Sequence, residues 1–188
     1  GNDYLVVNRG SKIDAVGTSS SPITMTGKQD ILGSANIETT RGLWGGLIIL
    51  GQAPINECSD DVRGTAACER VVEGSDDLMG GATSDDDSGR LKYLRILYSG
   101  YEVFPGNELN GITFGGVGNG TEVDYIQVHN NQDDCVEFFG GTVNVKHLIC
   151  TNSKDDGLDF DWGYQGKMQH VIVTQPDGTG DHIVESDN

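Results

Sequence analysis

The sequence predicts an all-β fold, a parallel β-helix in which short strands stack coil upon coil into a solenoid. Three observations lead to this prediction. Strand-like segments recur at a nearly constant spacing, helical periodicity is almost absent, and the chain has 28 glycines against 4 prolines. Abundant glycine without a collagen-like period is typical of many tight turns between short strands. A length of 188 residues suits one domain with a substantial core, and we expect residues 1–188 to form it.

The repeat is clearest in the second half of the chain. Three strand-like segments begin 22 and then 23 positions apart, at 125–128 (YIQV), 147–150 (HLIC) and 170–173 (HVIV). A second set accompanies them, at 112–116, 136–140 and 158–162. Coils of about 22–24 residues with two or three strands each are the signature of a solenoid. Leucine-rich-repeat spacing is missing, and an immunoglobulin-like sandwich would not repeat so regularly, so a parallel β-helix remains.

Coils stacked in register place equivalent residues above one another, and their inward positions form continuous apolar columns. The alignment predicts one inward column of Ile23, Leu47, Leu94, Ile126, Leu148 and Val171. It predicts a second column of Met25, Ile49, Ile96, Val128, Cys150 and Val173. Asn130 and Asn152 also align, either as an inward asparagine ladder or as exposed turn residues.

Two polar stretches interrupt the repeat, and we expect them to be loop insertions at about 56–90 and 99–110. Insertions of this kind often gather on one face of a solenoid and carry binding. The repeat begins at "DYLVVNRG" and stops after "HIVESDN" without an obvious cap. Because an uncapped solenoid exposes strand edges, we expect a fragment of a longer chain or a unit that associates end to end.

The net charge is −17, from 29 acidic and 12 basic residues. Contacts to a nucleic-acid backbone need clusters of lysine and arginine, so the composition excludes a nucleic-acid-binding function. No run of 18 apolar residues occurs, and the sequence therefore predicts no transmembrane segment. An acidic surface suits cation binding or an extracellular setting, although solvated aspartate-rich turns explain much of the charge equally well.

The four cysteines predict a disulfide framework, since none of them has zinc-ligand spacing. The stretch "CSDDVRGTAAC" encloses a polar loop and predicts a local Cys58–Cys68 disulfide. Cys135 and Cys150 form either a second disulfide across a corner between coils or two buried thiols, and the disulfide is the favoured interpretation. An even cysteine count with this spacing favours an oxidising, extracytoplasmic compartment.

The phrases "NQDDCVEFFGG" (131–141) and "SKDDGLDFDWG" (153–163) repeat with their acids in register. Coil stacking places three pairs of acids above one another, Asp133 over Asp155, Asp134 over Asp156 and Glu137 over Asp159, with Asp161 on the same strand face as Asp159. Carboxylates about 5 Å apart repel by roughly 3 kcal/mol at an effective dielectric of 20, so they must bind a cation, take up protons or turn into solvent.

Three interpretations of these acids stay open. Each Asp-Asp pair caps its turn through side-chain hydrogen bonds, which is the purely structural explanation. Alternatively calcium, which takes 6–8 oxygen ligands, is the cofactor bound by the four turn aspartates Asp133, Asp134, Asp155 and Asp156. In the third interpretation a polysaccharide is cleaved with the paired carboxyl groups of Glu137, Asp159 and Asp161. The scarcity of nearby lysine and arginine argues against polyuronate chemistry unless a metal supplies the charge.

Aromatic and histidine side chains near the acids also leave alternatives open. Trp162 and Tyr164 form a glycan-stacking platform if they are exposed, and they are ordinary core residues if they point inward. His147 and His170 occupy equivalent positions, so we expect an outward column with Tyr93 and Tyr125. A zinc or copper site between imidazoles one coil apart is the less favoured alternative.

Three stretches of the chain resemble a family of secreted bacterial parallel β-helix proteins that are often described as lipoproteins or hypothetical surface proteins. They are "RGLWGGLIILGQAPIN" (41–56), "NELNGITFGGVGNGTEVDYIQVHNNQDD" (107–134) and "EFFGGTVNVKHL" (137–148). The resemblance extends over nearly the whole chain. It implies a right-handed β-helix that is exported across the inner membrane, and it carries over no catalytic residue.

These features together predict a secreted or surface-attached structural or adhesive β-helix protein, stabilised by calcium and assembling through its ends. The expected partner is a carbohydrate or another cell-surface ligand. The alternative is a carbohydrate-active enzyme, a polysaccharide hydrolase or lyase, and the sequence leans towards the non-enzymatic interpretation.

Overall fold

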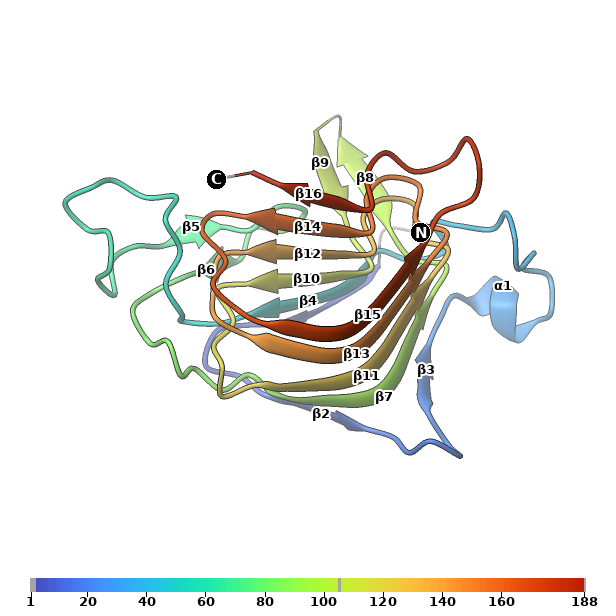
Figure 1. Ribbon diagram of the computed structural model, residues 1–188, viewed down its shortest axis with the longest axis horizontal. Helices are drawn as coiled ribbons and strands as arrows, with labels where there is room; N and C mark the ends of the chain where they lie inside the picture. The colour runs from blue at the N-terminus through green and yellow to red at the C-terminus, as the bar shows by residue number, and fades with distance from the viewer. Residues whose placement is uncertain (1–2, 105, 188) are drawn as a thin grey trace.

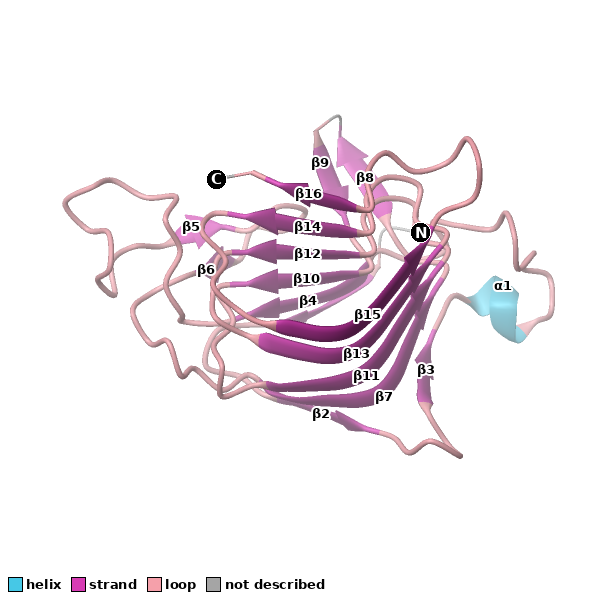
Figure 2. Ribbon diagram, viewed as in Figure 1, coloured by secondary structure: helices cyan, strands magenta, loops and turns pink. Residues whose placement is uncertain are grey.

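The computed structural model describes residues 3–104 and 106–187, and most of its strands run parallel in two sheets (Figure 1 and Figure 2). The first sheet has the spatial order β1 (Tyr4–Val7), β4 (Gly46–Leu50), β10 (Ile112–Gly115), β12 (Val136–Phe139), β14 (Leu158–Asp161) and β16 (Val184–Ser186). The second has the order β15 (Met168–Thr174), β13 (Asn144–Thr151), β11 (Glu122–His129), β7 (Gly89–Leu97) and β2 (Ile13–Val16), with β3 (Ile23–Met25) also on β7. The prediction of an all-β chain with parallel strands is confirmed.

From β10 onward the chain changes sheet with every strand. The strands β10, β12, β14 and β16 of the first sheet alternate in sequence with β11, β13 and β15 of the second. Neighbouring strands pair in parallel in both sheets, so each turn of the chain lies directly on the one before it (Figure 1). Residues 22–26 positions apart are therefore in contact, as Val136 with Leu158 and Leu158 with Val184.

Each long strand of the second sheet bends at one residue in the left-handed region of backbone space. These residues are Tyr93, Tyr125, His147 and His170, with φ of 49°, 55°, 49° and 62°. Such a conformation costs roughly 1–3 kcal/mol for a residue other than glycine. The four rings stack on the outside of the bend with centroids 4.2–4.8 Å apart, and each stacked pair returns about 0.5–1.5 kcal/mol. The predicted outward column is confirmed.

The core lies between the two sheets, and the predicted columns are confirmed except at one strand. Ile23, Leu94, Ile126, Leu148 and Val171 lie in register, and so do Met25, Ile96, Val128, Cys150 and Val173. The assignment of Leu47 and Ile49 to these columns is wrong, because both lie in β4 of the first sheet and pair with Ile112 and Phe114. Buried strands of both sheets share the same apolar alternation, so sequence similarity alone could not assign β4 to its sheet.

The first sheet contributes an aromatic column to the core. Phe114, Phe138 and Phe160 pair in register, with ring centroids 5.2 and 5.5 Å apart. Tyr164 packs on the same column, 4.6 Å from Phe138 and 5.3 Å from Phe160, and its hydroxyl donates to the carbonyl of Val143. The Tyr164 ring is therefore part of the core.

The Cys135–Cys150 disulfide forms at the corner where the chain passes from the second sheet back to the first. In the neighbouring coils the two equivalent positions hold a glycine and a valine. A Cβ on Gly111 would lie 2.5 Å from Val128 Cγ1, and one on Gly157 would lie 2.4 Å from Val173 Cγ1. Two side chains fit at this corner only when they are bonded to each other, which explains why a cysteine replaces the glycine. The predicted disulfide is confirmed.

The insertions carry the remaining elements. Residues 57–88 contain the Cys58–Cys68 disulfide, also as predicted, and the antiparallel pair β5 (Arg70–Val71) and β6 (Leu78–Met79). A hairpin of β8 (Tyr101–Phe104) and β9 (Asn107–Leu109) projects beside the first sheet (Figure 1). Helix α1 (Lys28–Ile31) has 4 residues, and no helix in the described parts of the chain is long and apolar enough to span a membrane.

Asn130 and Asn152 both adopt left-handed φ, of 56° and 62°, at the turns after β11 and β13. Asn130 is fully buried, and its side-chain amide donates to the carbonyl of Ile37 in a long loop. Asn152 is half-buried, and its carbonyl accepts two hydrogen bonds from the Arg41 guanidinium. The two residues are thus turn asparagines that anchor the 32–45 loop.

Candidate cation site

Acidic side chains form a column on the outer face of the first sheet. Glu137, Asp159 and Glu185 pair in register on β12, β14 and β16, and Thr113 holds the equivalent position on β10. They point away from the core because their neighbours along each strand, such as Val136 and Phe138, point into it. The predicted stacking of Glu137 over Asp159 is confirmed, and both side chains are nevertheless buried, at 5% and 9% exposure.

The Asp-Asp pairs occupy the turns that precede β12 and β14, and the second aspartate of each pair links successive coils. Asp134 Oδ1 accepts the backbone N–H of Asp156 at 2.8 Å. One coil further on, Asp156 Oδ1 accepts the N–H of His182 at 2.7 Å. These two aspartates therefore cap the equivalent turn of the next coil, rather than their own turn as the structural interpretation of the sequence expected. Each still has a second oxygen, and Asp156 Oδ2 has no hydrogen-bond partner among the described residues.

Two further acids reach the column from the insertions. Glu73 lies in the turn between β5 and β6, and Glu108 lies in β9; the Glu73 carboxylate accepts the Glu108 backbone N–H at 3.0 Å. The insertions and coils together enclose a pocket of about 270 Å³. Its lining consists of nine carboxylate residues, Glu73, Glu108, Asp133, Asp134, Glu137, Asp155, Asp159, Asp161 and Glu185. We call this the carboxylate pocket.

Burial and mutual repulsion raise the pKa values in the carboxylate pocket. Desolvation is the largest cause throughout, and neighbouring acids add to it. The pKa is raised to about 9 for Asp134, to about 8 for Asp133, and to about 7 for both Asp159 and Glu73. For the fully buried Glu137 the pKa lies well above its ordinary value. Several of these groups therefore keep their protons at neutral pH unless a cation neutralises the pocket.

The oxygens converge closely enough to share an ion. Asp134, Glu137 and Asp159 each offer one carboxylate oxygen, and these atoms lie within 4.8 Å of one another. Asp159 Oδ1 is buried without a hydrogen-bond partner in the described part of the chain. Glu137 also accepts a hydrogen bond from the side-chain amide of Asn110, which holds its carboxylate in place. An all-oxygen set of this kind is what calcium prefers.

An aromatic groove adjoins the carboxylate pocket and shares Glu73 with it. Its volume is about 690 Å³, and its rings are Tyr4, Tyr101, Phe104 and Trp162. Trp162 is half-buried, stacks 4.7 Å from Phe139, and has the Arg70 guanidinium 5.9 Å from its ring. Of the two side chains expected to stack on a glycan, Trp162 thus lines an open groove, whereas Tyr164 lies in the core.

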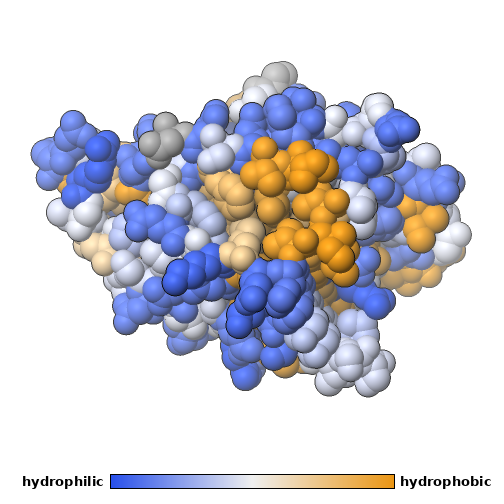
Figure 3. Space-filling model, viewed as in Figure 1, coloured by the Kyte–Doolittle hydropathy of each residue, from blue (hydrophilic) through white to orange (hydrophobic). Residues whose placement is uncertain are grey.

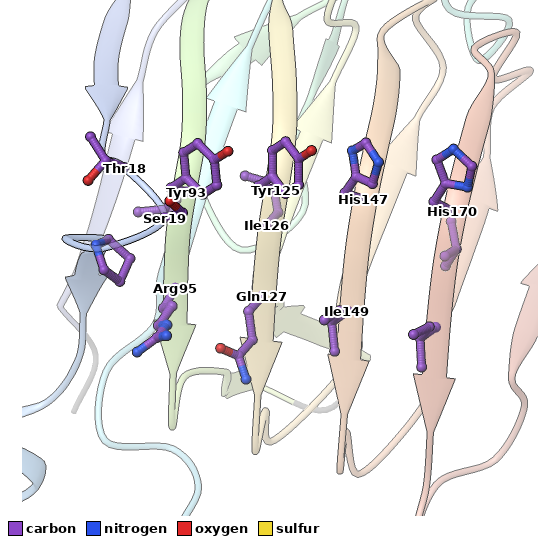
Figure 4. Close-up of a pocket in the computed structure, with 14 residues that line it drawn as sticks. Thr18, Ser19, Tyr93, Arg95, Tyr125, Ile126, Gln127, His147, Ile149 and His170 are labelled. Atoms are coloured by element: carbon purple, nitrogen blue, oxygen red, sulfur yellow. The ribbon is translucent and has the colours of Figure 1, made fainter.

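A second groove, of about 550 Å³, follows the bend of the second sheet on another face of the molecule (Figure 4). One wall is the ring column of Tyr93, Tyr125, His147 and His170, and the opposite side chains include Arg95 and Gln127. The rings lie face to face, and His147 Nδ1 is 2.8 Å from Asp124 Oδ1. The two imidazoles therefore form a stacked ladder, with one of them already hydrogen-bonded to a carboxylate.

A comparison with models of known protein families places the chain in one of them. The family model of the pectate-lyase-like β-helix domain matches residues 1–188, the whole chain.

The chain belongs to the pectate-lyase-like β-helix family. No match was found among curated proteins. None was found among solved structures. The residues that line the pockets of this pectate-lyase-like domain are therefore the basis for inferring its function.

The structure brings together every acid that the sequence singled out and adds others. Asp133, Asp155 and Asp161 line the carboxylate pocket with the acids discussed above, while Asp156 lies at its edge. Sequence reasoning missed Glu73, Glu108 and Glu185. Glu185 follows Val184 as Asp159 follows Leu158, so its alignment was available in the sequence. Glu73 and Glu108 had no such signal, because the insertions do not obey the repeat.

Proposed function

We propose that this domain is a secreted or surface-attached structural and adhesive β-helix whose carboxylate pocket binds calcium. The observation that carries the proposal is the lining of that pocket, nine acids without a lysine or arginine among the described residues. The raised pKa values indicate that bringing these carboxylates together causes a loss of folding stability. A divalent cation reverses that loss and fastens Glu73 and Glu108 of the insertions to Glu137 and Asp159 of the coils.

The two disulfides support the extracytoplasmic part of the proposal, because such bonds persist in oxidising compartments. We expect the coil to be right-handed, because connections between parallel strands of one sheet strongly favour that hand. The end of the coil stack at β14 and β15 supports end-to-end association with a second copy. There the core residues Phe160, Val171 and Val173 are only half-buried, and apolar side chains gather on this face in Figure 3.

Thermal melting at pH 8 in EDTA and in excess calcium tests the proposal. Calcium at about 100 times its Kd stabilises a binding-competent fold by about 2.7 kcal/mol. For a domain of this length that corresponds to a rise in Tm of about 5–11 °C. The Glu137→Gln/Asp159→Asn double variant should lose most of the rise, whereas the exposed control Glu38→Gln should keep it. Equal Tm values with EDTA and with millimolar calcium would rule out the cation site.

The second candidate function is a polysaccharide hydrolase or lyase, and the adjoining aromatic groove favours it. Tyr101, Phe104 and Trp162 offer ring surface beside Glu137, Asp159 and Asp161. Glu137, whose pKa is strongly raised, suits a general acid. Asp161, whose pKa is raised less, suits a nucleophile or base. Release of reducing ends from neutral and acidic polysaccharides, with Asp159→Asn as the control, tests this candidate. If none of the polysaccharides yields a product, the enzyme candidate is refuted and the structural role remains.

A further inference from the structure

His182 lies in the turn before β16, beside the carboxylate pocket, and three carboxylates surround one of its ring nitrogens. The Nδ1 atom is 3.5 Å from Asp156 Oδ1, 3.7 Å from Asp181 Oδ2 and 3.9 Å from Glu185 Oε1. All three distances exceed those of a hydrogen bond. The same chain shows the usual alternative at His147, whose Nδ1 approaches Asp124 Oδ1 to 2.8 Å.

The spacing around His182 leaves room for an ion between its ring and the carboxylates of Asp156 and Glu185. Two ligand atoms on a tetrahedral zinc ion, with bonds of about 2.0–2.1 Å, lie about 3.3 Å apart. The distances from His182 Nδ1 to the three carboxylates are only slightly longer than that. In addition, the potential ligand atoms of Asp156, His182 and Glu185 all lie within 4.8 Å of one another.

A second observation also points to a ligand, the unpartnered oxygen of Asp156. This side chain is 1% exposed, its Oδ1 accepts the His182 N–H, and its Oδ2 has no hydrogen-bond partner among the described residues. A buried carboxylate oxygen left without a donor is costly. A cation bound between Asp156 and Glu185 relieves this cost.

We propose that Asp156, His182 and Glu185 form a site for a zinc-class transition-metal ion. The imidazole nitrogen distinguishes it from the carboxylate pocket, since imidazole suits zinc, copper and nickel, whereas calcium takes oxygen ligands. The site goes beyond the proposed function, although Glu185 also lines the carboxylate pocket and Asp156 lies at the edge of that pocket. Bound metal would fasten the turn before β16 to the preceding coil, whose Asp156 already accepts the backbone N–H of His182.

Zinc titration by calorimetry, together with the visible absorption of the cobalt(II)-loaded protein, tests the site. The wild type should bind zinc and show the d–d bands of a cobalt site with a nitrogen ligand. His182→Ala should weaken zinc at least about tenfold, as loss of even an outer-shell partner commonly does. His182 is 53% exposed at the side chain, so the fold should survive the change, and a far-UV spectrum checks this. His170→Ala is the matched control, an exposed histidine on the same last coil.

Each outcome decides for or against the site. Zinc binding that is lost in His182→Ala and kept in His170→Ala supports it. Failure of the wild type to bind zinc, an unchanged affinity in His182→Ala, or equal losses in both histidine variants would overturn it. Glu137→Gln separates the two proposals, because it should weaken the calcium response of the carboxylate pocket and leave zinc affinity unchanged. A protein that binds zinc through His182 but ignores calcium would refute the calcium pocket alone.

Discussion

Replacement of Glu137 by glutamine should have opposite consequences with and without calcium. Glu137 is buried in the carboxylate pocket, and oxygens of Asp134 and Asp159 lie within 4.8 Å of its own. Two unit charges at that separation repel by about 3 kcal/mol at an effective dielectric of 20. Glutamine keeps the shape and can still accept the hydrogen bond from Asn110, but it removes the charge. It should therefore stabilise the calcium-free protein and weaken the calcium-bound one.

The gain should depend on pH, and its sign follows from the raised pKa of Glu137. Below the ordinary glutamic acid pKa, both the folded and the unfolded chain are protonated, and the substitution changes little. As pH rises above it, the unfolded chain loses its proton while the folded protein retains it, so wild-type stability falls until the raised folded pKa is passed. In EDTA, Glu137→Gln should therefore match the wild-type Tm near pH 5. Near pH 9 its Tm should be higher by up to about 6–12 °C.

Melting curves at pH 5 and pH 9, each in EDTA and in calcium, measure these effects. The exposed Glu38→Gln removes the same charge outside the pocket and should show neither effect. A Tm that falls in Glu137→Gln at pH 9 in EDTA would mean that the Asn110 contact outweighs the repulsion. That result, or an undiminished calcium response, would refute the reasoning.

Three other perturbations test the fold and the pocket. In EDTA the wild-type Tm should fall between pH 5 and pH 9, because acids with pKa raised to about 7–9 keep protons in the folded protein that the unfolded chain has already lost. A Tm that rises over this range would contradict the raised values. Cys135→Ser/Cys150→Ser should lower the free energy of unfolding by about 2–5 kcal/mol in urea denaturation, and an unchanged midpoint would show that the corner does not need its bond. Phe138→Ala, in the fully buried aromatic column, should cost about 3–5 kcal/mol in the same assay, with the exposed Ile31→Ala as a control expected near zero.

Most of the fold prediction came from the periodicity of the sequence, because the spacing of equivalent residues along the chain determines which residues touch in stacked coils. Residues 22–26 positions apart lie above one another, so aligning "VEFF" with "LDFD" already paired Glu137 with Asp159 and Phe138 with Phe160. The same reasoning failed for Leu47. A strand buried on both faces has one pattern whichever sheet it joins, and only the pairing with Ile112 distinguishes the two sheets.

The acids divide in the same way. The alignment of the acids was predictable from the doubled phrase. Turn capping and ion binding were also predictable as their two candidate roles. In the structure the two roles fall on different atoms, since Asp134 caps the next turn with Oδ1 and also lines the carboxylate pocket. Such a division depends on where each oxygen points, and no sequence spacing reports that.

By itself, then, the sequence determined the coil, most of its inward columns, the Cys58–Cys68 disulfide and the stack of acids on the first sheet, because all of these repeat or are local in the chain. It favoured the Cys135–Cys150 disulfide without deciding it. Only the tertiary structure decided which other residues surround the stacked acids. Glu73 and Glu108 reach the pocket from insertions of irregular length, and His182 meets Asp156 from 26 positions away through a turn. Long-range packing places these residues, and packing rather than periodicity makes the aligned acids a pocket.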